Sequence, residues 1–369
     1  MIGSRALFPD LAARSYLAHC GISPVSTPVR AAVEEVLASY ARLGVGALPR
    51  WLEQRAALRA AIARLVGARA EDVGLVANTT TGVIDVAWSL PWRAGDRVVV
   101  FEGEFPANVT PWQRAAAQFD LEVVRLPLDL DALARALRDG VRLVAVSAVQ
   151  FQTGFAAPIH EMCHMCHVAG AELFVDAIQA VGVVPFSVGE IDYVSCGSHK
   201  WLMGIEGCGF VYIRPDRVGT LVPRLAGWLS HEDPVGFLFG GRLTHDRGFR
   251  ARADVFEVGA ANVAGLAALG AAIEVLPPVE AVFTHVQRWH DAIEPRLAER
   301  GFVSLRHPTG RSGILSLVPP VDAQHLVRGL AARGVVASAP EGNLRLAPSW
   351  PNAMDEVDAV VAAVDAVLA

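Results

Sequence analysis

The stretch ELFVDAIQAVGVVPFSVGEIDYVSCGSHKWLMGIEGCGFVYIRP, residues 172–215, contains the pattern that decides the fold. Three short apolar segments in it, Glu172–Asp176, Tyr193–Ser195 and Gly209–Ile213, have the length of strands and are separated by turns that contain glycine. Runs that are apolar at nearly every position are typical of strands buried on both faces of a sheet. We therefore predict that this stretch forms the centre of a buried α/β sheet.

The same pattern extends toward the N-terminus, where short apolar segments alternate with amphipathic stretches. This alternation is typical of a mostly parallel sheet with helices on its faces. The further predicted strands are Val73–Ala77, Arg97–Phe101, Glu122–Arg125 and Leu143–Ala148, and two of the predicted helices are Pro111–Phe119 and Leu130–Arg138.

The C-terminal part of the chain has a different pattern. An alanine-rich helix, Asn262–Leu276, is followed by two prolines and a long helical pattern through Arg300. Two strand-like segments and two more helices then predict a smaller α+β domain. The segments are SGILSLV (312–318), NLRLAP (343–348), Ala323–Arg333 and Met354–Leu368. We assign residues 20–276 to a large domain, and residues 1–19 and 277–369 to a small one.

The composition excludes several classes of protein. With 369 residues, 53% of them hydrophobic, the chain is long and apolar enough to bury a substantial core. A net charge of −6 without a basic stripe argues against nucleic acid as a partner. Residues 1–16 lack the apolar run of a signal peptide, and no apolar run approaches the length of a membrane span. Five scattered cysteines suit a reducing compartment, so we expect a cytoplasmic protein.

Two residues of the opening stretch stand where such a sheet places its chemistry. Asp176 ends a predicted strand, and open α/β sheets bind ligands at the carboxyl ends of their strands. Lys200 lies beyond the next strand, in a polar turn flanked by glycine. This order suits a pyridoxal phosphate (PLP) enzyme, in which a lysine forms a Schiff base and a carboxylate pairs with the pyridine nitrogen. Taken singly, each residue has an ordinary explanation: Asp176 as a helix cap and Lys200 as a surface residue. Their order and spacing together favour the PLP site.

The segments VDAIQA (175–180) and DYVSCGSHKWL (192–202), with the G.GF.YIR pattern that follows, resemble the pattern of fold-type I PLP enzymes of the class V aminotransferase family. This family includes cysteine desulfurases, kynureninase and isopenicillin N epimerase. The resemblance implies a fold-type I PLP-dependent transferase fold and covers nearly the whole chain. It is also carried by YLAHCGISP (16–24), NTTTGV (78–83), EFPANVTPW (104–112), FEVGAAN (256–262) and LRLAPSWPNAMDEVDAVVAAV (344–364).

The resemblance implies a role for each matching residue on the cofactor side. Lys200 would be the Schiff-base lysine and the acid/base that moves the α-proton, Asp176 would hold the pyridine nitrogen, and Gln179 would contact the ring's phenolic oxygen. Phe105 would stack on the ring face, where core packing is the rival explanation. Four further residues would surround the phosphate: Thr80, Thr81, Ser198 and His199. For the threonines the alternative is an ordinary helix cap, although a helix N-terminus is itself an anion site.

Three residues match positions on the substrate side. Arg345 matches the residue that binds the substrate α-carboxylate, for which a guanidinium is well shaped; a surface salt bridge is the alternative. Phe151 stands where the desulfurases have an asparagine beside the cofactor. His19 would line the substrate pocket, or belong only to a structural turn.

The segment before Arg345, RGVVASAPEGNLRLAP (333–348), lacks the mobile-loop cysteine that desulfurases use to take sulfur as a persulfide. We therefore favour a β-eliminating, C–S type lyase that acts on an amino acid through an external aldimine and a Cα carbanion. An aminotransferase or an epimerase/cyclase of the same family is the alternative. A catalytically silent protein of the same fold is a further one, against which the presence of both Asp176 and Lys200 argues.

The family resemblance also bears on assembly. It implies a homodimer with active sites at the interface, where Ala260 replaces a hydroxyl residue that often reaches the partner's phosphate. The glycine- and aromatic-rich segment 227–241 resembles a loop over the active site, and we expect it to select the substrate. Exchanging it for a relative's loop would test this hypothesis.

The segment EMCHMCHVAG, residues 161–170, matches the C-x-x-C-H pattern of haem attachment. Pro158 and Gly170 predict one helix over 159–169, on which Cys163 and Cys166 share an apolar stripe. Haem attachment needs exposed thiols, and zinc would need a second pair of ligands at suitable spacing. We favour a core helix and no metal, with a metal or haem site at 163–167 kept as the alternative.

Overall fold

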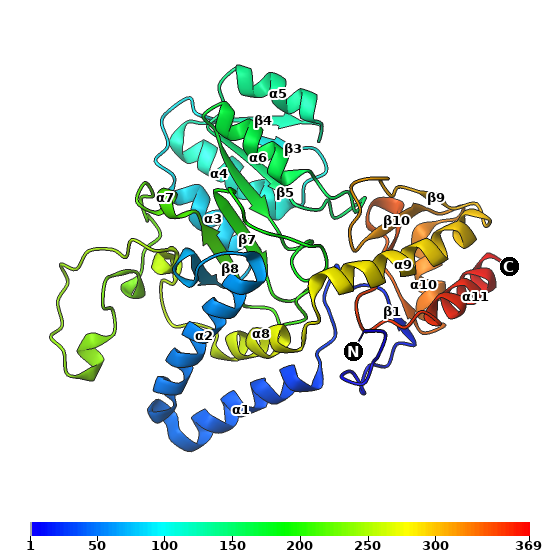
Figure 1. The fold of residues 1–369 in the computed structure, drawn as a ribbon, viewed down its shortest axis with the longest axis horizontal. Coiled ribbons are helices and arrows are strands. Elements are labelled where there is room, and N and C mark those ends of the chain that lie inside the picture. The colour runs from blue at the N-terminus through cyan, green and yellow to red at the C-terminus, as the bar shows by residue number, and fades with distance from the viewer. Residues whose placement is uncertain (1) are drawn as a thin grey trace.

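The computed structural model describes residues 2–369. Its centre is a seven-stranded sheet in the order β2-β8-β7-β6-β5-β3-β4 (Figure 1). All seven strands that the sequence predicted belong to this sheet, with ends that differ by at most two residues. They are β2 (Val73–Val76), β3 (Arg97–Phe101), β4 (Glu122–Leu126), β5 (Leu143–Ser147), β6 (Glu172–Asp176), β7 (Tyr193–Gly197) and β8 (Gly209–Ile213).

The sheet is mostly parallel, as predicted. Strands β3 to β7 pair in parallel, whereas β8 runs antiparallel to both of its neighbours, β2 and β7. Parallel strands of one sheet end at the same edge, so the residues that follow β5, β6 and β7 come together there.

Helices cover both faces of the sheet, and each face has its own apolar core. The alternating residues of β3 show this, because Val98 and Val100 pack in the core beneath α3 (Thr79–Ser89) and α4 (Thr110–Phe119), while Val99 and Phe101 pack on the opposite face. The opposite core is covered by α2 (Leu48–Val66), α5 (Leu130–Arg138), α6 (Ile159–Val168), α8 (Val263–Val275) and part of α9 (Val279–Ala298).

A third core lies in the C-terminal part of the chain. A three-stranded antiparallel sheet, in the order β12-β10-β9, packs with helices at one end of the molecule (Figure 1). The N-terminal strand β1 (Ser15–Tyr16) pairs in parallel with β11 (Val335–Val336). The other elements of this part are β9 (Val303–Ser304), β10 (Leu315–Val318), β12 (Leu344–Leu346), α10 (Ala323–Ala331) and α11 (Glu356–Leu368). The division at residues 19/20 and 276/277 stays a prediction.

Two long helices were not predicted. Helix α1 (Thr27–Leu43) buries only Val29, Val36 and Ser39, and most of its contacts are with α8. A stripe this narrow gives a weak helical periodicity, and the same holds for the partly buried α2. The remaining short helices are α7 (Pro215–Val218), η1 (Gly44–Ala47), η2 (Ala70–Asp72), η3 (Pro106–Asn108), η4 (Trp228–Ser230), η5 (Gly236–Phe239), η6 (Ala253–Phe256) and η7 (Pro340–Gly342).

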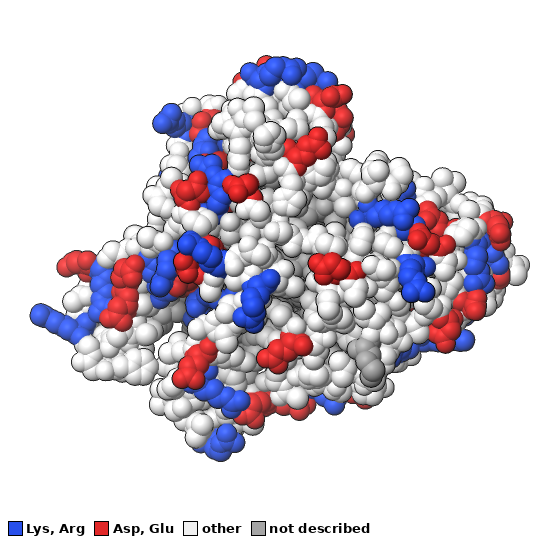
Figure 2. Space-filling model, in the orientation of Figure 1, with Lys and Arg blue, Asp and Glu red and all other residues white. Residues whose placement is uncertain are grey.

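Residues 219–252, between α7 and η6, extend away from the rest of the molecule as an arm (Figure 1). Lysine and arginine are interspersed with aspartate and glutamate over the face in Figure 2, with no large patch of one sign. Within residues 2–369 no single helix is long and apolar enough to span a membrane, and only α8 and α9 together, bent by 76°, meet that criterion.

Candidate active site

Lys200 lies in the turn that follows β7, at the carboxyl edge of the sheet. The turn is fixed by the amides of Met203 and Gly204, which donate to the carbonyls of Lys200 and Ser198. Burial lowers the pKa of Lys200, and the charge of Asp176 acts in the opposite direction. Among residues 2–369 no acceptor lies within hydrogen-bond distance of its amine, so the nitrogen is free to react.

Asp176 ends the neighbouring strand β6 and is 4% exposed. Its Oδ1 accepts a hydrogen bond of 3.0 Å from the amide of Ile178, and no donor of the described chain reaches Oδ2. Burial raises the pKa of Asp176 to about 6, while this hydrogen bond and the charge of Lys200 lower it. A buried carboxylate with one unpaired oxygen is suited to a cationic N–H partner.

Gln179 is held at both ends of its amide. Its Nε2 donates to the carbonyl of Cys20 at 3.0 Å, and its Oε1 accepts from the indole of Trp201 at 2.8 Å. The residue therefore ties the N-terminal segment to the lysine turn. His19, next to Cys20, is fully buried, stacks on Trp201 and contacts the Ser23 hydroxyl at 2.8 Å. Burial lowers the pKa of His19 to about 3, so the imidazole is neutral.

Phe105 lies beside the lysine, and Phe151 lies beside Phe105. The ring centroid of Phe105 is 5.7 Å from the amine nitrogen of Lys200 and 5.2 Å from the ring of Phe151, in an edge-to-face arrangement. Phe105 is 47% exposed, so part of its surface is open to a ligand.

Arg345, on β12, approaches the same region from the C-terminal sheet. Its Nη1 donates to the carbonyl of Phe151 at 2.6 Å and its Nε to the hydroxyl of Ser338 at 3.1 Å. Its neighbours Leu344 and Leu346 pack in the third core, whereas Arg345 points away from that core. The strand alternation predicted from the sequence is therefore present.

The threonine turn begins α3. The side chain of Asn78 caps this helix and accepts from the amide of Thr81 at 2.9 Å and from its hydroxyl at 3.2 Å, while Thr80 is exposed. The helix start is joined to the end of β7 by the amide of Gly197, which donates to the hydroxyl of Thr79 at 2.8 Å. Sequence reasoning did not identify Thr79, because its partner Gly197 is remote in the chain. It also did not identify Asn78, although the bond of Asn78 to Thr81, three residues on, is a local helix-cap pattern.

Gly82 lets α3 approach the sheet closely, because a Cβ there would lie 2.3 Å from the Ser195 hydroxyl. A cavity of about 330 Å³ adjoins the turn, and its lining includes Thr81, Gly207 and Ala260. Ser198 is fully buried and its hydroxyl donates to the carbonyl of Ile205, whereas His199 is partly exposed. The helix N-terminus and this cavity are suited to an anion such as a phosphate.

The residues at this edge fit PLP. The free amine of Lys200 can react with an aldehyde, the unpaired Oδ2 of Asp176 can accept from a protonated pyridine, and the exposed part of Phe105 can cover a planar ring. The start of α3 can hold a phosphate. These four features together match the four parts of PLP: its aldehyde, its ring nitrogen, its ring face and its phosphate.

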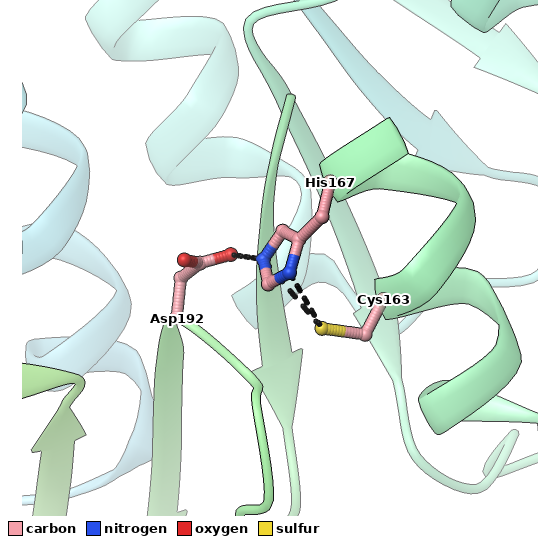
Figure 3. A group of neighbouring side chains, drawn as sticks. All are labelled: Cys163, His167 and Asp192. Carbon is pink, nitrogen blue, oxygen red and sulfur yellow. Dashed lines mark hydrogen bonds and ion pairs between the residues drawn. The ribbon is translucent and has the colours of Figure 1, made fainter. Parts of the chain in front are cut away.

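A second polar cluster, outside this region, consists of Cys163, His167 and Asp192 (Figure 3). The imidazole lies between the thiol and the carboxylate, with Nε2 2.9 Å from Asp192 Oδ2. Asp192 also pairs with Arg214 at 3.1 Å and Arg217 at 2.8 Å, and burial raises the pKa of the Cys163 thiol to about 11. Two guanidinium groups and a protonated thiol disfavour a cation there.

The helix predicted at 159–169 is α6, which ends one residue earlier and has Pro158 as its N-cap rather than its first residue. Both of its cysteines are buried, with Cys163 2% and Cys166 0% exposed. Thiols in this position are not accessible for bonds to a haem.

Comparisons with known proteins identify relatives of this chain. Residues 23–349 match the family model described as Aminotransferase class-V. An uncharacterized aminotransferase of Bacillus subtilis, YcbU, is 27% identical over 96% of this chain and 94% of its own length. A probable cysteine desulfurase of Methanothermobacter thermautotrophicus is 30% identical over 73% of this chain and 68% of its own.

Solved structures of the cystine C–S lyase C-DES have the same fold. A C-DES mutant with glycine covalently linked to its PLP cofactor has a TM-score of 0.89, with 23% identity over 98% of both chains. The complex of C-DES with its product, cysteine persulfide, also has a TM-score of 0.89, with 22% identity over 97% of this chain and 98% of that one. The predicted α/β fold of fold-type I PLP enzymes is thereby confirmed.

Proposed function

Because this chain belongs to the class V aminotransferase family and is a PLP-dependent enzyme, we propose that it is a lyase that eliminates a β-substituent from a small amino acid. Bound PLP supplies an acceptor for the electron pair left at the substrate's α-carbon. The family and the cofactor were both predicted from the sequence. The choice of β-elimination is our proposal.

The observation that carries this choice is the burial of every cysteine. All five, Cys20, Cys163, Cys166, Cys196 and Cys208, are free and buried, and the segment before Arg345 contains none. A thiol that takes up sulfur and passes it to an acceptor has to be accessible and partly ionised. β-Elimination requires no protein thiol, because the leaving group departs with the electron pair of its own bond to carbon.

Lys200 would attach the cofactor through its aldehyde and then remove the substrate's α-proton with Nζ. A base works best when its pKa lies near the working pH, and burial shifts the pKa of this amine in that direction. Asp176 would pair with the ring nitrogen through Oδ2, Gln179 would contact the phenolic oxygen, and Phe105 would cover one ring face. The phosphate would be held by Thr80, Thr81, Ser198 and His199.

Arg345 would bind the substrate's α-carboxylate. Its Nη2 is not used by Ser338 or Phe151, so the guanidinium keeps donors for a ligand while two other N–H groups fix its orientation. Phe151 and the neutral His19 would form the apolar side of the substrate pocket.

The enzyme would act as a homodimer. The arm at residues 219–252 exposes seven large apolar side chains, an unusual density for a surface that faces only water. They are Val222, Leu225, Trp228, Leu238, Phe239, Leu243 and Phe249. A second subunit would cover them and place the active sites at the interface, where segment 227–241 would help to select the substrate.

An aminotransferase is the second candidate, supported by the aminotransferase name of the full-length relative from Bacillus subtilis. Both reactions need the same base and the same carboxylate-binding residue. An epimerase or cyclase of the family would need them too.

The test is to incubate the purified protein, reconstituted with PLP, with cystine, cysteine, kynurenine and other amino acids. Pyruvate with ammonia would identify β-elimination, whereas a keto acid that depends on an added amino acceptor would identify transamination. Lys200→Ala should lose the yellow absorption band of the covalently attached cofactor and reduce turnover at least about a thousandfold. Wild-type protein that does not take up PLP would overturn the proposal.

A further inference from the structure

Glu104 lies directly before Phe105 and is bonded to the end of a central strand. Its Oε1 accepts from the amide of Ser147 at 2.6 Å, and its Oε2 accepts from the hydroxyl of the same residue. Ser147 is the last residue of β5. The segment that carries Phe105 is therefore fastened to the carboxyl edge of the sheet.

Asn108 fastens the same segment on its other side. Its side-chain Nδ2 donates to Glu104 Oε2 at 3.3 Å, and its Oδ1 accepts from the indole of Trp112 at 3.1 Å. Its backbone N–H donates to the backbone carbonyl of Phe105 at 2.8 Å. Asn108 and Trp112 are fully buried, whereas Phe105 is 47% exposed. Since packing holds only part of the Phe105 ring, its position depends on these anchors.

The anchor point of Glu104 is also the strand neighbour of Asp176. Ser147 pairs with Asp176 across β5 and β6, and the amide of Ala148 donates to the carbonyl of Asp176 at 2.8 Å. Burial raises the pKa of Glu104 to about 7, the bonds from Ser147 and Asn108 lower it, and the charge of Asp176 raises it further. The carboxyl group of Glu104, held in the segment after β3 by the end of β5, therefore interacts electrostatically with that of Asp176 at the end of β6.

We propose that Glu104 is a positioning residue, which connects Phe105 to the strand pair β5–β6. It thereby fixes the position of Phe105, on the face of the PLP ring, relative to the carboxylate of Asp176, at the ring nitrogen. This inference rests on the proposed contacts of Phe105 and Asp176 with PLP. It adds a residue that touches neither the cofactor nor the substrate.

Three variants separate position from charge. Glu104→Ala removes the anchor, whereas Glu104→Gln keeps its shape and both bonds to Ser147: the amide oxygen can accept from the Ser147 amide and the amide nitrogen can donate to the Ser147 hydroxyl. Glu104→Gln loses only the longer, 3.3 Å bond from Asn108 Nδ2. Glu102→Gln is the matched control, because Glu102 is exposed, two residues away, and its side chain makes no bond with the described residues.

The readouts are the dissociation constant of PLP, the visible circular dichroism of the bound cofactor, and the melting temperature of the cofactor-free protein. We expect Glu104→Ala to weaken PLP binding about tenfold and to reduce the dichroic band, because it loses bonds to a carboxylate. Glu104→Gln should stay within about twofold of wild type, as should Glu102→Gln. Equal losses in the Ala and Gln variants would overturn a role in positioning.

A double-mutant cycle identifies the route of the effect. If Glu104 acts through Phe105, Glu104→Ala should weaken PLP binding little further when Phe105→Ala is already present. Additive losses, or PLP binding and dichroism in Glu104→Ala equal to those of Glu102→Gln, would refute the proposal. Wild-type protein that binds no PLP would instead refute the proposed function, so the two failures are distinguishable.

Discussion

Nη1 of Arg345 donates a 2.6 Å hydrogen bond to the carbonyl of Phe151, and this bond joins the C-terminal sheet to the turn after β5. The guanidinium is thereby held from both parts of the chain, and it is only 8% exposed. Its orientation is fixed before any substrate arrives, which lowers the entropy lost on binding a carboxylate.

We expect Arg345→Lys to raise KM at least about tenfold with a smaller change in kcat, because an ammonium cannot bond Phe151, Ser338 and a carboxylate in one plane. Steady-state kinetics with the preferred amino acid measure the effect. Arg328→Lys, at an exposed arginine without an ion-pair partner in the described chain, is the control and should match wild type. An unchanged KM in Arg345→Lys would remove this residue from the substrate site.

Asp176→Asn should stabilise the cofactor-free protein at alkaline pH. The folded-state pKa of Asp176, about 6, lies above the usual unfolded value, so its contribution to stability is present below about pH 4 and is lost as pH rises through 6. We expect the variant to gain on the order of 2 kcal/mol in free energy of unfolding at pH 8 and less at pH 5.

Urea unfolding of the cofactor-free protein at the two pH values tests this expectation, with Asp131→Asn on the exposed side of α5 as the control. The same Asp176 variant should bind PLP at least about tenfold more weakly, because the ring nitrogen loses its ionic partner. If the stability gained by Asp176→Asn over wild type were no larger at pH 8 than at pH 5, burial of the Asp176 carboxylate would not cost the stability that we infer.

Cys20 is the cysteine next to the proposed site, and the residue is only 1% exposed. Burial raises the pKa of this thiol, although the charges of Arg345 and Lys200 lower it. We expect Cys20→Ala to keep its rate of product release within about twofold, since the carbonyl that holds Gln179 is retained and elimination uses no thiol. Loss of sulfide release together with loss of a protein-bound persulfide in this variant would indicate sulfur transfer through Cys20.

Asp192→Ala should destabilise the protein by about 3–5 kcal/mol, because Arg214 and Arg217 lose a fully buried partner. Asp216→Ala removes an exposed partner of the same Arg214 and should cost less than about 1 kcal/mol. Denaturant unfolding measures both, and treatment with a chelator should leave the melting temperature of wild type unchanged. Stoichiometric metal whose removal lowers that temperature would restore the metal interpretation of Cys163 and His167.

Replacing Leu238 and Phe239 together by aspartate should convert the proposed dimer to monomer, because two charges would be buried at the interface. Val168→Asp is the control, since Val168 is 76% exposed on α6, outside the arm. Analytical ultracentrifugation measures the mass. A dimer that survives the double change would show that the arm is not the interface.

The sheet was predictable because its strands are apolar on both faces, as in β6 and β8, where all five residues are buried. Asp176 and Lys200 were predictable for a related reason: Asp176 ends such a strand, and Lys200 lies in the short turn after the next one. Glu104 and Ser147 were not, because their bond depends on which strands become neighbours in the sheet, and local spacing carries no such information. Helix α1 was missed because its buried stripe is narrow.

The pairing of β1 with β11 also constrains the order in which the molecule is made. Ser15 and Tyr16 are translated about 320 residues before their partners Val335 and Val336. Until then the carbonyl of Cys20, close behind β1, lacks the support that brings it to Gln179. At about 5–20 residues per second, the interval between translation of β8 and of β11 gives the large sheet roughly 6–24 seconds to fold first. The contact between Cys20 and Gln179 would then form only after β11 has been translated, although Asp176 and Lys200 are made much earlier.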